Sequence, residues 1–201
     1  MNKKAERGQA TREHLVAVAT RLFTERGYEG TSIEAVLQDS GVSRGALYHH
    51  FGGKDALFAA VLDTVYDHTG ESMAAATRDA PDPVSALRAG CRAWIRLTAD
   101  PAVHRIVLID APSVLGWQRW RELDERRVLR QVKVALTAAA DTAHLAPGHV
   151  VFFAHALLAS MNEIAMLIAR ADDPAAAAAE ADTAVDELLH RILDAPAAPP
   201  R

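Results

Sequence analysis

The stretch that decides the fold begins at Thr31 and reads TSIEAVLQDSGVSRGALYHHFGGK, ending at Lys54. Thr31 and Glu34 have the spacing of a capping box, in which the hydroxyl and the carboxylate each bond an amide that the first turn of a helix leaves free. Gly41 ends this short helix, and Ser43 is placed to cap a second one directly after it. Two short helices joined by a turn that contains glycine are typical of a helix-turn-helix.

Amphipathic helices are predicted on both sides of this stretch. Apolar residues recur at i, i+3, i+4 and i+7 from residue 9 to Arg26, and Gly27 is suited to end that helix. Gly52-Gly53 separate the helix-turn-helix from the next one. The same pattern predicts further helices over residues 55–78, 84–99, 101–110, 117–143, 149–170 and 174–194. We therefore expect an all-α fold of about nine helices.

The second helix of the helix-turn-helix carries the candidate sequence readers. A sharp turn at Gly41 lets this helix protrude far enough to enter a DNA major groove, where its first residues face the base edges. These residues are Ser43, Arg44, Gly45 and Ala46. Gly45 and Ala46 have almost no side chain, so the helix can lie close to the bases. Arg44 is a natural bidentate partner of guanine.

Candidate phosphate contacts surround these readers. Tyr48 offers a hydroxyl and Lys54 a point charge, and the amides that open the helices after Thr31 and Gly53 face outward with the positive end of the helix dipole. His49 could contact either a phosphate or a base. The pattern therefore predicts that this unit binds double-stranded DNA.

Composition sets the broad class of protein. Of the 201 residues, half are apolar and about a quarter are charged, so the chain can bury a sizeable core. The net charge of −4 argues at first against a nucleic-acid partner. However, residues 1–60 hold eight lysines and arginines against seven acidic residues, which leaves +1 there and −5 in the remainder. The single cysteine, Cys91, excludes an internal disulfide and is interpreted as a small buried apolar residue.

A membrane partner is not expected. We find no run of about 18 apolar residues, and no apolar signal-peptide core follows the charged N-terminus. The sequence therefore predicts a cytoplasmic protein.

Several motifs match one family of regulators in order and spacing. They are Thr31-Ser32-Ile33, Gly41-Val42-Ser43, Gly45-Ala46-Leu47-Tyr48-His49-His50-Phe51 and Lys54-Asp55-Ala56-Leu57. With them, about residues 10–71 resemble the DNA-binding domain of the tetracycline-repressor (TetR) family. The resemblance implies an all-helical homodimer whose N-terminal helices bind a palindromic operator and whose variable C-terminal domain takes a small-molecule inducer.

The resemblance also places the family's DNA contacts on this sequence. By position they fall on Thr31, Ser43, Arg44, Tyr48, His49 and Lys54. Gly53 stands where many relatives have a serine cap, and glycine is a tolerated N-cap residue. The expected regions are a flexible tail over residues 1–10, the DNA-binding domain over 11–71, a ligand-binding and dimerisation domain over 72–194, and a loose tail over 195–201.

The last two predicted helices are candidates for a dimer interface. One helix-turn-helix touches few bases, so useful specificity requires two copies on a two-fold symmetric site. Each of the two helices carries an apolar stripe, and small side chains allow close approach in a four-helix bundle. The candidate residues are Val151, His155, Leu158, Asn162, Val185, Leu188, Leu189 and Ile192. The alternative is that both stripes bury against their own domain, and the family resemblance favours dimerisation.

The middle helices are expected to enclose a cavity for an unidentified effector. The candidate lining combines apolar walls with a few polar groups, as ligand pockets do. It consists of Trp94, His104, Leu108, Trp117, Trp120, Met161 and Asn162. Each of these residues taken singly is more typical of a protein core than of a pocket.

Other classes of protein find less support in the sequence. An enzyme is not indicated, because H-E-x-x-H, C-x-x-C and G-x-G-x-x-G motifs are missing. We predict no cofactor and no metal site, since His144, His149 and His155 lack the i, i+4 spacing that puts two ligands on one helix face. The alternative to a regulator is a helical protein-interaction module that does not bind DNA. Such a module would have no reason to keep Gly41, Tyr48 and Lys54 together.

Overall fold

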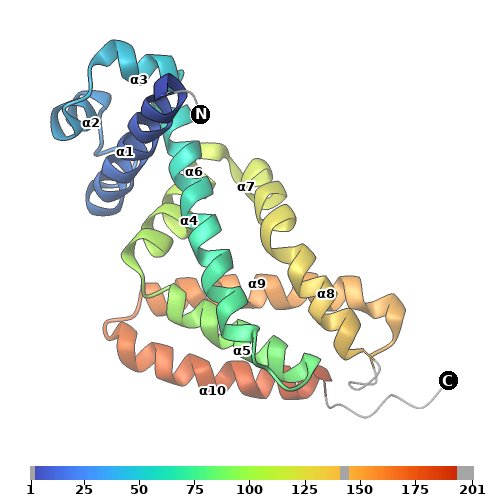
Figure 1. The fold of residues 1–201 in the computed structure, drawn as a ribbon. Helices are drawn as coiled ribbons and strands as arrows, with labels where there is room; N and C mark the ends of the chain where they lie inside the picture. Colours follow the sequence, from blue (N-terminus) through green and yellow to red (C-terminus); the bar gives the residue numbers. More distant parts are fainter. Residues whose placement is uncertain (1–2, 141–144, 194–201) are drawn as a thin grey trace. The chain divides into compact units, whose positions relative to one another are not determined.

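The computed structural model describes residues 3–140 and 145–193, and every regular element among them is a helix (Figure 1). The all-α expectation is confirmed. The elements are α1 (Lys3–Arg26), α2 (Ile33–Ser40), α3 (Arg44–His50), α4 (Lys54–Thr77), α5 (Pro83–Leu97), η1 (Val103–Asp110), α6 (Ala111–Leu115), α7 (Trp117–Asp124), η2 (Glu125–Leu129), α8 (Arg130–Ala139), η3 (Pro147–His149), α9 (Val150–Ala169) and α10 (Pro174–Leu193).

The chain divides into two compact units. The N-terminal unit comprises residues 1–68 together with 101–117, and the C-terminal unit comprises residues 69–100 together with 118–201. Helix α4 contributes residues to both. The sequence placed 101–117 in the ligand-binding domain, whereas the structure groups this segment with the helix-turn-helix. Helix α1 begins at Lys3, so most of the segment expected to be a tail is helical. The expected tail over residues 195–201 and His144 lie outside the described residues.

The core of the N-terminal unit is built on one face of α1. Leu15, Leu22 and Phe23 on this helix are completely buried. The Phe23 ring meets the Phe58 ring of α4 edge to face at a centroid distance of 5.2 Å, and Tyr28 meets Phe58 in the same way at 5.1 Å. Each buried leucine or phenylalanine contributes about 1.5–3 kcal/mol through removal of its apolar surface from water. The buried face of α1, which the i, i+3, i+4 pattern predicted, thus forms the core on which the short helices α2 and α3 pack.

Segment 101–117 joins the N-terminal unit through a buried carboxylate. Element η1 is a π-helical stretch that continues directly into α6. At its end Asp110 is only 7% exposed, and it accepts a hydrogen bond of 2.8 Å from the backbone N–H of Tyr28. It also pairs with Arg105, whose Nε lies 3.2 Å from Oδ1. These bonds fix the turn that follows α1, because a buried carboxylate is stable only when it is paired.

The C-terminal unit contains four mutually packed helices, α5, α8, α9 and α10. Helix α5 lies against the other three, and α9 lies beside both α8 and α10. Their shared core includes Leu136, Leu157 and Leu189, none of which is more than 1% exposed. Ion pairs add to the contact between α5 and α10, where Arg92 bonds Asp186. The expected helix over residues 117–143 is observed as α7, a π-helical stretch at η2, and α8.

Helix α9 is the most apolar element of the chain. By length and composition the helical stretch Pro147–Ala169 could cross a membrane, with a mean hydropathy of 1.7 in its most apolar window and 33% of that window buried. The apolar stretch is therefore longer than the sequence analysis inferred. Core helices of soluble bundles have the same composition, and α9 packs against α5, α8 and α10. We interpret its apolar character as a requirement of protein packing.

Candidate nucleic-acid interface

The cap of α2 differs from the predicted capping box. Ser32 is the N-cap residue, and its hydroxyl accepts a 3.1 Å hydrogen bond from the N–H of Ala35. Thr31 is only 1% exposed, and its hydroxyl donates to the carbonyl oxygens of Leu22, at 3.1 Å, and Gly27, at 2.9 Å. The prediction that Thr31 caps α2 is wrong. Its hydroxyl is also too buried to bond a phosphate, and it fixes the turn from α1 to α2 instead.

The turn between α2 and α3 forms as predicted. Gly41 adopts a left-handed conformation with φ of 66°, which glycine takes without a steric penalty, and its N–H donates to the carbonyl oxygen of Leu37. Ser43 caps α3 by accepting a 3.3 Å hydrogen bond from the N–H of Ala46. Leu47 is completely buried and holds α3 on the core. The opposite side of α3 is consequently free to face outward.

The predicted readers lie together on this outward side. Ser43, Arg44 and Gly45 are exposed, and Ala46 is half-buried at the edge of the same surface. Further along the helix His49 is exposed, and Tyr48 is 48% exposed. A large aromatic side chain left in solvent is suited to contact a partner. The first turn of α3 thus presents small residues and one guanidinium in the arrangement that major-groove reading requires.

Residues 41–45 have the spacing G-x-S-x-G, which is also found at the nucleophilic serine of many hydrolases. In those enzymes the serine stands on a sharp turn from a strand to a helix. Here the turn joins two helices, and the hydroxyl of Ser43 is used as a cap. The glycine and serine of this motif are therefore interpreted as the residues that form the turn and cap the helix.

Arg44 already has a partner in the free protein. Its Nη2 lies 2.6 Å from Oε1 of Glu34 on α2, and both side chains are more than half exposed. The hydrogen bond to Arg44 lowers the pKa of the Glu34 carboxyl, so this group is ionised at neutral pH. The sequence analysis assigned Glu34 to the capping box and missed this pairing. Glu34 thus holds the guanidinium of Arg44 in an exposed ion pair between α2 and α3.

Replacing Glu34 by glutamine is expected to raise the affinity for any DNA by about three- to tenfold, because the change removes one negative charge beside the phosphates and releases Arg44. Fluorescence anisotropy with DNA of random sequence measures this effect. Glu187→Gln is a matched control, since Glu187 pairs with Arg191 at 2.5 Å on α10. An affinity for random DNA that does not change in Glu34→Gln would contradict the role assigned to this carboxylate.

Lys54 lies in an aromatic and acidic setting at the start of α4. Its Nζ stands 4.0 Å from the centre of the Tyr28 ring, within the range of a cation–π interaction. The Tyr28 hydroxyl donates to the carboxylate of Asp55. Burial, and then this hydrogen bond, raise the pKa of Tyr28, so the hydroxyl remains a donor. The ring of Tyr28 therefore positions the Lys54 ammonium.

The acidic residues near this surface are paired. Glu34 bonds Arg44, Asp55 accepts from Tyr28, and Asp39 bonds Arg21 at 2.6 Å. The two arginines partly offset the negative charge of Glu34 and Asp39, which explains how a unit with a small net charge can approach a polyanion. The arrangement defines a helix-turn-helix protein whose reading helix is exposed and whose flanking charges are held in place.

Comparisons with known proteins identify the family. Residues 15–61 match the family model of bacterial regulatory proteins of the tetR family, and residues 84–192 match the tetracyclin repressor-like C-terminal domain. A solved TetR-family transcriptional regulator from Pectobacterium atrosepticum has 31% identity and a TM-score of 0.81, and the match covers 95% of this chain and 98% of that one. The chain belongs to the TetR family of DNA-binding transcriptional regulators.

Curated relatives match mainly in the N-terminal part. The regulator AcrR of Shigella flexneri is 37% identical over 87 residues, which are 43% of this chain and 40% of the relative. The repressor AcnR of Corynebacterium glutamicum is 43% identical over 51 residues, which are 25% of this chain and 27% of the relative. The chain thus matches less than half the length of these relatives. A TetR-family regulator from Streptomyces coelicolor, at 22% identity and a TM-score of 0.73, shows the same fold.

The C-terminal unit contains a cavity of about 280 Å³, which α4, α5, η2, α8 and α9 line. Trp94, Met161 and Asn162 line it as predicted, and so does Leu158, which was expected at the dimer interface. The other four candidates lie outside the lining of this cavity. His104, Leu108 and Trp117 belong to the N-terminal unit, and Trp120 is buried but is not part of the lining. The candidates come from several helices, and tertiary packing decides which of them meet.

The predicted dimer residues divide in a similar way. Val185 and Leu189 are completely buried, because this stripe of α10 faces α5 and α9 of its own chain, and they cannot meet a partner. His155, Leu158, Asn162, Leu188 and Ile192 are half-buried, and Val151 is 48% exposed. The sequence analysis missed Phe152, which is 74% exposed, and Leu167, which is 60% exposed. Because α9 is apolar all round, its sequence alone does not show which stripe faces outward.

Proposed function

We propose that this protein is a ligand-responsive repressor that binds a palindromic operator as a homodimer and leaves it when a small molecule binds. The observation that carries the proposal is the exposed first turn of α3, where Arg44 stands beside the small residues Gly45 and Ala46. The curated relatives support repression through AcnR, whose name is that of a repressor, although FasR of Mycolicibacterium smegmatis is named an activator. Binding to chromosomal DNA places the protein in the cytoplasm.

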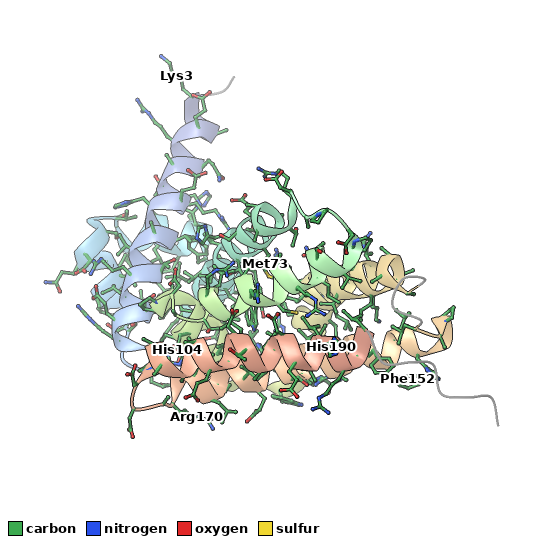
Figure 2. All side chains as sticks on the ribbon, turned by 90° about the horizontal axis from the view of Figure 1, so that it is seen from below. Lys3, Met73, His104, Phe152, Arg170 and His190 are labelled. Atoms are coloured by element: carbon green, nitrogen blue, oxygen red, sulfur yellow. The ribbon has the colours of Figure 1, made fainter. Side chains whose placement is uncertain are left out.

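A second copy of the chain is the proposed occupant of the outer face of α9. Val151, Phe152 and Leu167 leave apolar surface in solvent on this helix. Phe152, which Figure 2 labels, lies near the start of α9, and Leu167 lies near its end, so the proposed face includes both ends of the helix. Apolar surface of this kind marks protein contacts. Two-fold pairing of α9 would also supply the second reading helix that a palindrome needs.

Charge on this face is expected to separate the subunits. Phe152→Glu with Leu167→Glu places four carboxylates in a two-fold interface, and we expect monomers at concentrations where the wild type is dimeric. Sedimentation equilibrium measures the change. Val134→Glu is the control, because Val134 is an equally exposed apolar residue, at 64%, on α8. A double variant that stays dimeric would exclude this face as the interface.

Helix α4 is the proposed link between effector and DNA. Lys54 opens this helix, whereas Met73, Ala74 and Thr77 near its other end line the cavity. A ligand that binds one arrangement of α4 more tightly than another shifts the population towards that arrangement. Release follows if the favoured state spaces the two reading helices wrongly for the operator.

Binding to the DNA upstream of the protein's own gene tests the proposal. We expect salt-sensitive, site-specific binding by the wild type. Tyr48→Phe with Lys54→Ala should weaken it, and Lys54→Ala alone should flatten the dependence on log salt concentration by about one unit per subunit. Unchanged folding of the variants, measured by circular dichroism, is the control. If the wild type binds this DNA no more tightly than a random sequence, the proposal of a site-specific repressor fails. If the wild type binds no DNA at all, the result favours a helical protein-interaction module.

A further inference from the structure

The cavity of the C-terminal unit is uncharged. Sixteen of the described residues line it, and none of these is an aspartate, glutamate, lysine, arginine or histidine. Its polar side chains are Thr77, Gln131 and Asn162, and the hydroxyl of Thr77 donates within its own helix to the carbonyl oxygens of Met73 and Ala74. The remaining wall is aliphatic or aromatic, apart from Cys91.

Cys91 in this wall and the charged groups around it do not supply a charge to a ligand. Burial, and then the charge of Asp186, raise the pKa of the Cys91 thiol to about 12, so the thiol is neutral at physiological pH. Asp186 is itself engaged by Arg88 and Arg92, and Arg92 also pairs with Asp182. These charges are balanced between α5 and α10. An ion in the cavity would therefore lose its hydration without gaining a counter-ion, which is strongly unfavourable.

Trp94 is a wall residue whose buried indole N–H has an unused capacity to donate a hydrogen bond. Its side chain lines the cavity and is only 7% exposed. Within the described part of the chain, its indole N–H has no hydrogen-bond partner. Buried donors are nearly always paired, so an orphaned one marks a position where a bound molecule can complete the structure.

On the basis of the proposed function, we infer that the effector is a small, electrically neutral and mainly apolar molecule with a hydrogen-bond acceptor for the N–H of Trp94. The volume of about 280 Å³ lies just below the usual range for ligand pockets and suits one compact ring system. A larger groove, of about 850 Å³, has only one wall, because residues 122–138 of a single helical stretch line it. A small molecule could not be enclosed there.

A matched pair of fluorescent probes tests the charge requirement. N-phenyl-1-naphthylamine is neutral, and 8-anilinonaphthalene-1-sulfonate has the same skeleton with an added sulfonate. We expect the neutral probe to bind at least about tenfold more tightly than the sulfonate.

Gly90→Leu tests whether the probe binds in the cavity. A Cβ on Gly90 would make an ordinary 3.6 Å contact with Thr77, so the leucine side chain should fill the cavity and abolish binding of the probe. Gly70→Leu, on α4 but not in the lining, is the control. Preference for the sulfonate, or binding of the neutral probe that Gly90→Leu leaves intact, would overturn the inference.

The acceptor is tested by competition against the neutral probe. Tetralin and 1-tetralone share one bicyclic skeleton, and only the ketone accepts a hydrogen bond. We expect the ketone to displace the probe from the wild type at about fivefold lower concentration than tetralin does. In Trp94→Phe, which keeps an aromatic ring but removes the donor, the two compounds should displace the probe equally well. An advantage of the ketone that persists unchanged in Trp94→Phe, or that is missing in the wild type, would contradict the role of Trp94.

Anisotropy with the upstream DNA, measured on the same protein, separates the two proposals. If the protein binds the DNA but prefers the sulfonate probe, the inference about the effector fails and the proposed function stands. If the protein does not bind the DNA while the neutral probe occupies the cavity, the proposed function fails and the chemistry of the cavity stands.

Discussion

Arg44→Ala is expected to cost about 1–3 kcal/mol of base discrimination at each half-site, and therefore about 2–6 kcal/mol for a dimer on a palindrome. The reason is geometric: Arg44 is exposed in the first turn of α3, where Gly45 has no side chain to keep the helix away from the bases. Competition between the upstream DNA and variants changed at single base pairs measures this loss. The loss should be concentrated at one base pair in each half-site.

Arg191→Ala provides the matched control for this experiment. Arg191 is also an exposed arginine in a close ion pair with a glutamate, but it lies on α10 in the C-terminal unit. It should leave both the affinity and the sequence preference unchanged. If Arg44→Ala weakens binding to all sequences equally, Arg44 contacts phosphate and another residue reads the bases.

Asp110→Ala is expected to lower the free energy of unfolding of the N-terminal unit by about 1–3 kcal/mol. The variant leaves the backbone N–H of Tyr28 without its partner and removes the carboxylate that Arg105 bonds. It should also weaken DNA binding, since Tyr28 carries the ring under Lys54 and the hydroxyl that bonds Asp55. Urea titration followed by circular dichroism measures the stability, and operator titration measures the affinity.

Two further variants define the cause of this loss. Asp110→Asn keeps an acceptor for the N–H of Tyr28 and should lose less than Asp110→Ala. Ser113→Ala, at an exposed position on α6, should change neither quantity. Equal stability of Asp110→Ala and Ser113→Ala would mean that the carboxylate does not hold the turn after α1.

The pairing of Arg44 with Glu34 affects how specificity arises. In the free protein the Glu34 carboxylate bonds the Arg44 guanidinium at 2.6 Å. Arg44 can therefore bond a base only if it gives up this ion pair. A base with a single acceptor replaces it poorly, whereas a guanine offers two acceptors. Both partners are largely exposed, and exposed ion pairs contribute little to stability. Removal of Glu34 is therefore expected to raise the affinity for random DNA more than the affinity for the operator, and so to lower the discrimination between DNA sequences.

Local signals predicted most of the reading unit. The positive φ of Gly41, the cap at Ser43 and the burial of Leu47 all depend on residues within one turn of each other, and each is found as expected. Ser32 and Thr31 show where this reasoning stops. Either hydroxyl can cap α2 by its position in the sequence, and the choice depends on the carbonyl oxygens of Leu22 on α1 and of Gly27 in the turn after it.

The Thr31–Lys54 stretch, by itself, determined that this protein has a helix-turn-helix, because helix caps, glycine turns and apolar periods act over a few residues. Tertiary structure alone decided which polar groups remain available. It buried the hydroxyl of Thr31, paired Arg44 with Glu34, placed Lys54 over Tyr28, and turned Val185 inward while it left Phe152 in solvent. These outcomes depend on contacts between different elements of the fold, and an apolar period shows that a face is buried without showing what buries it.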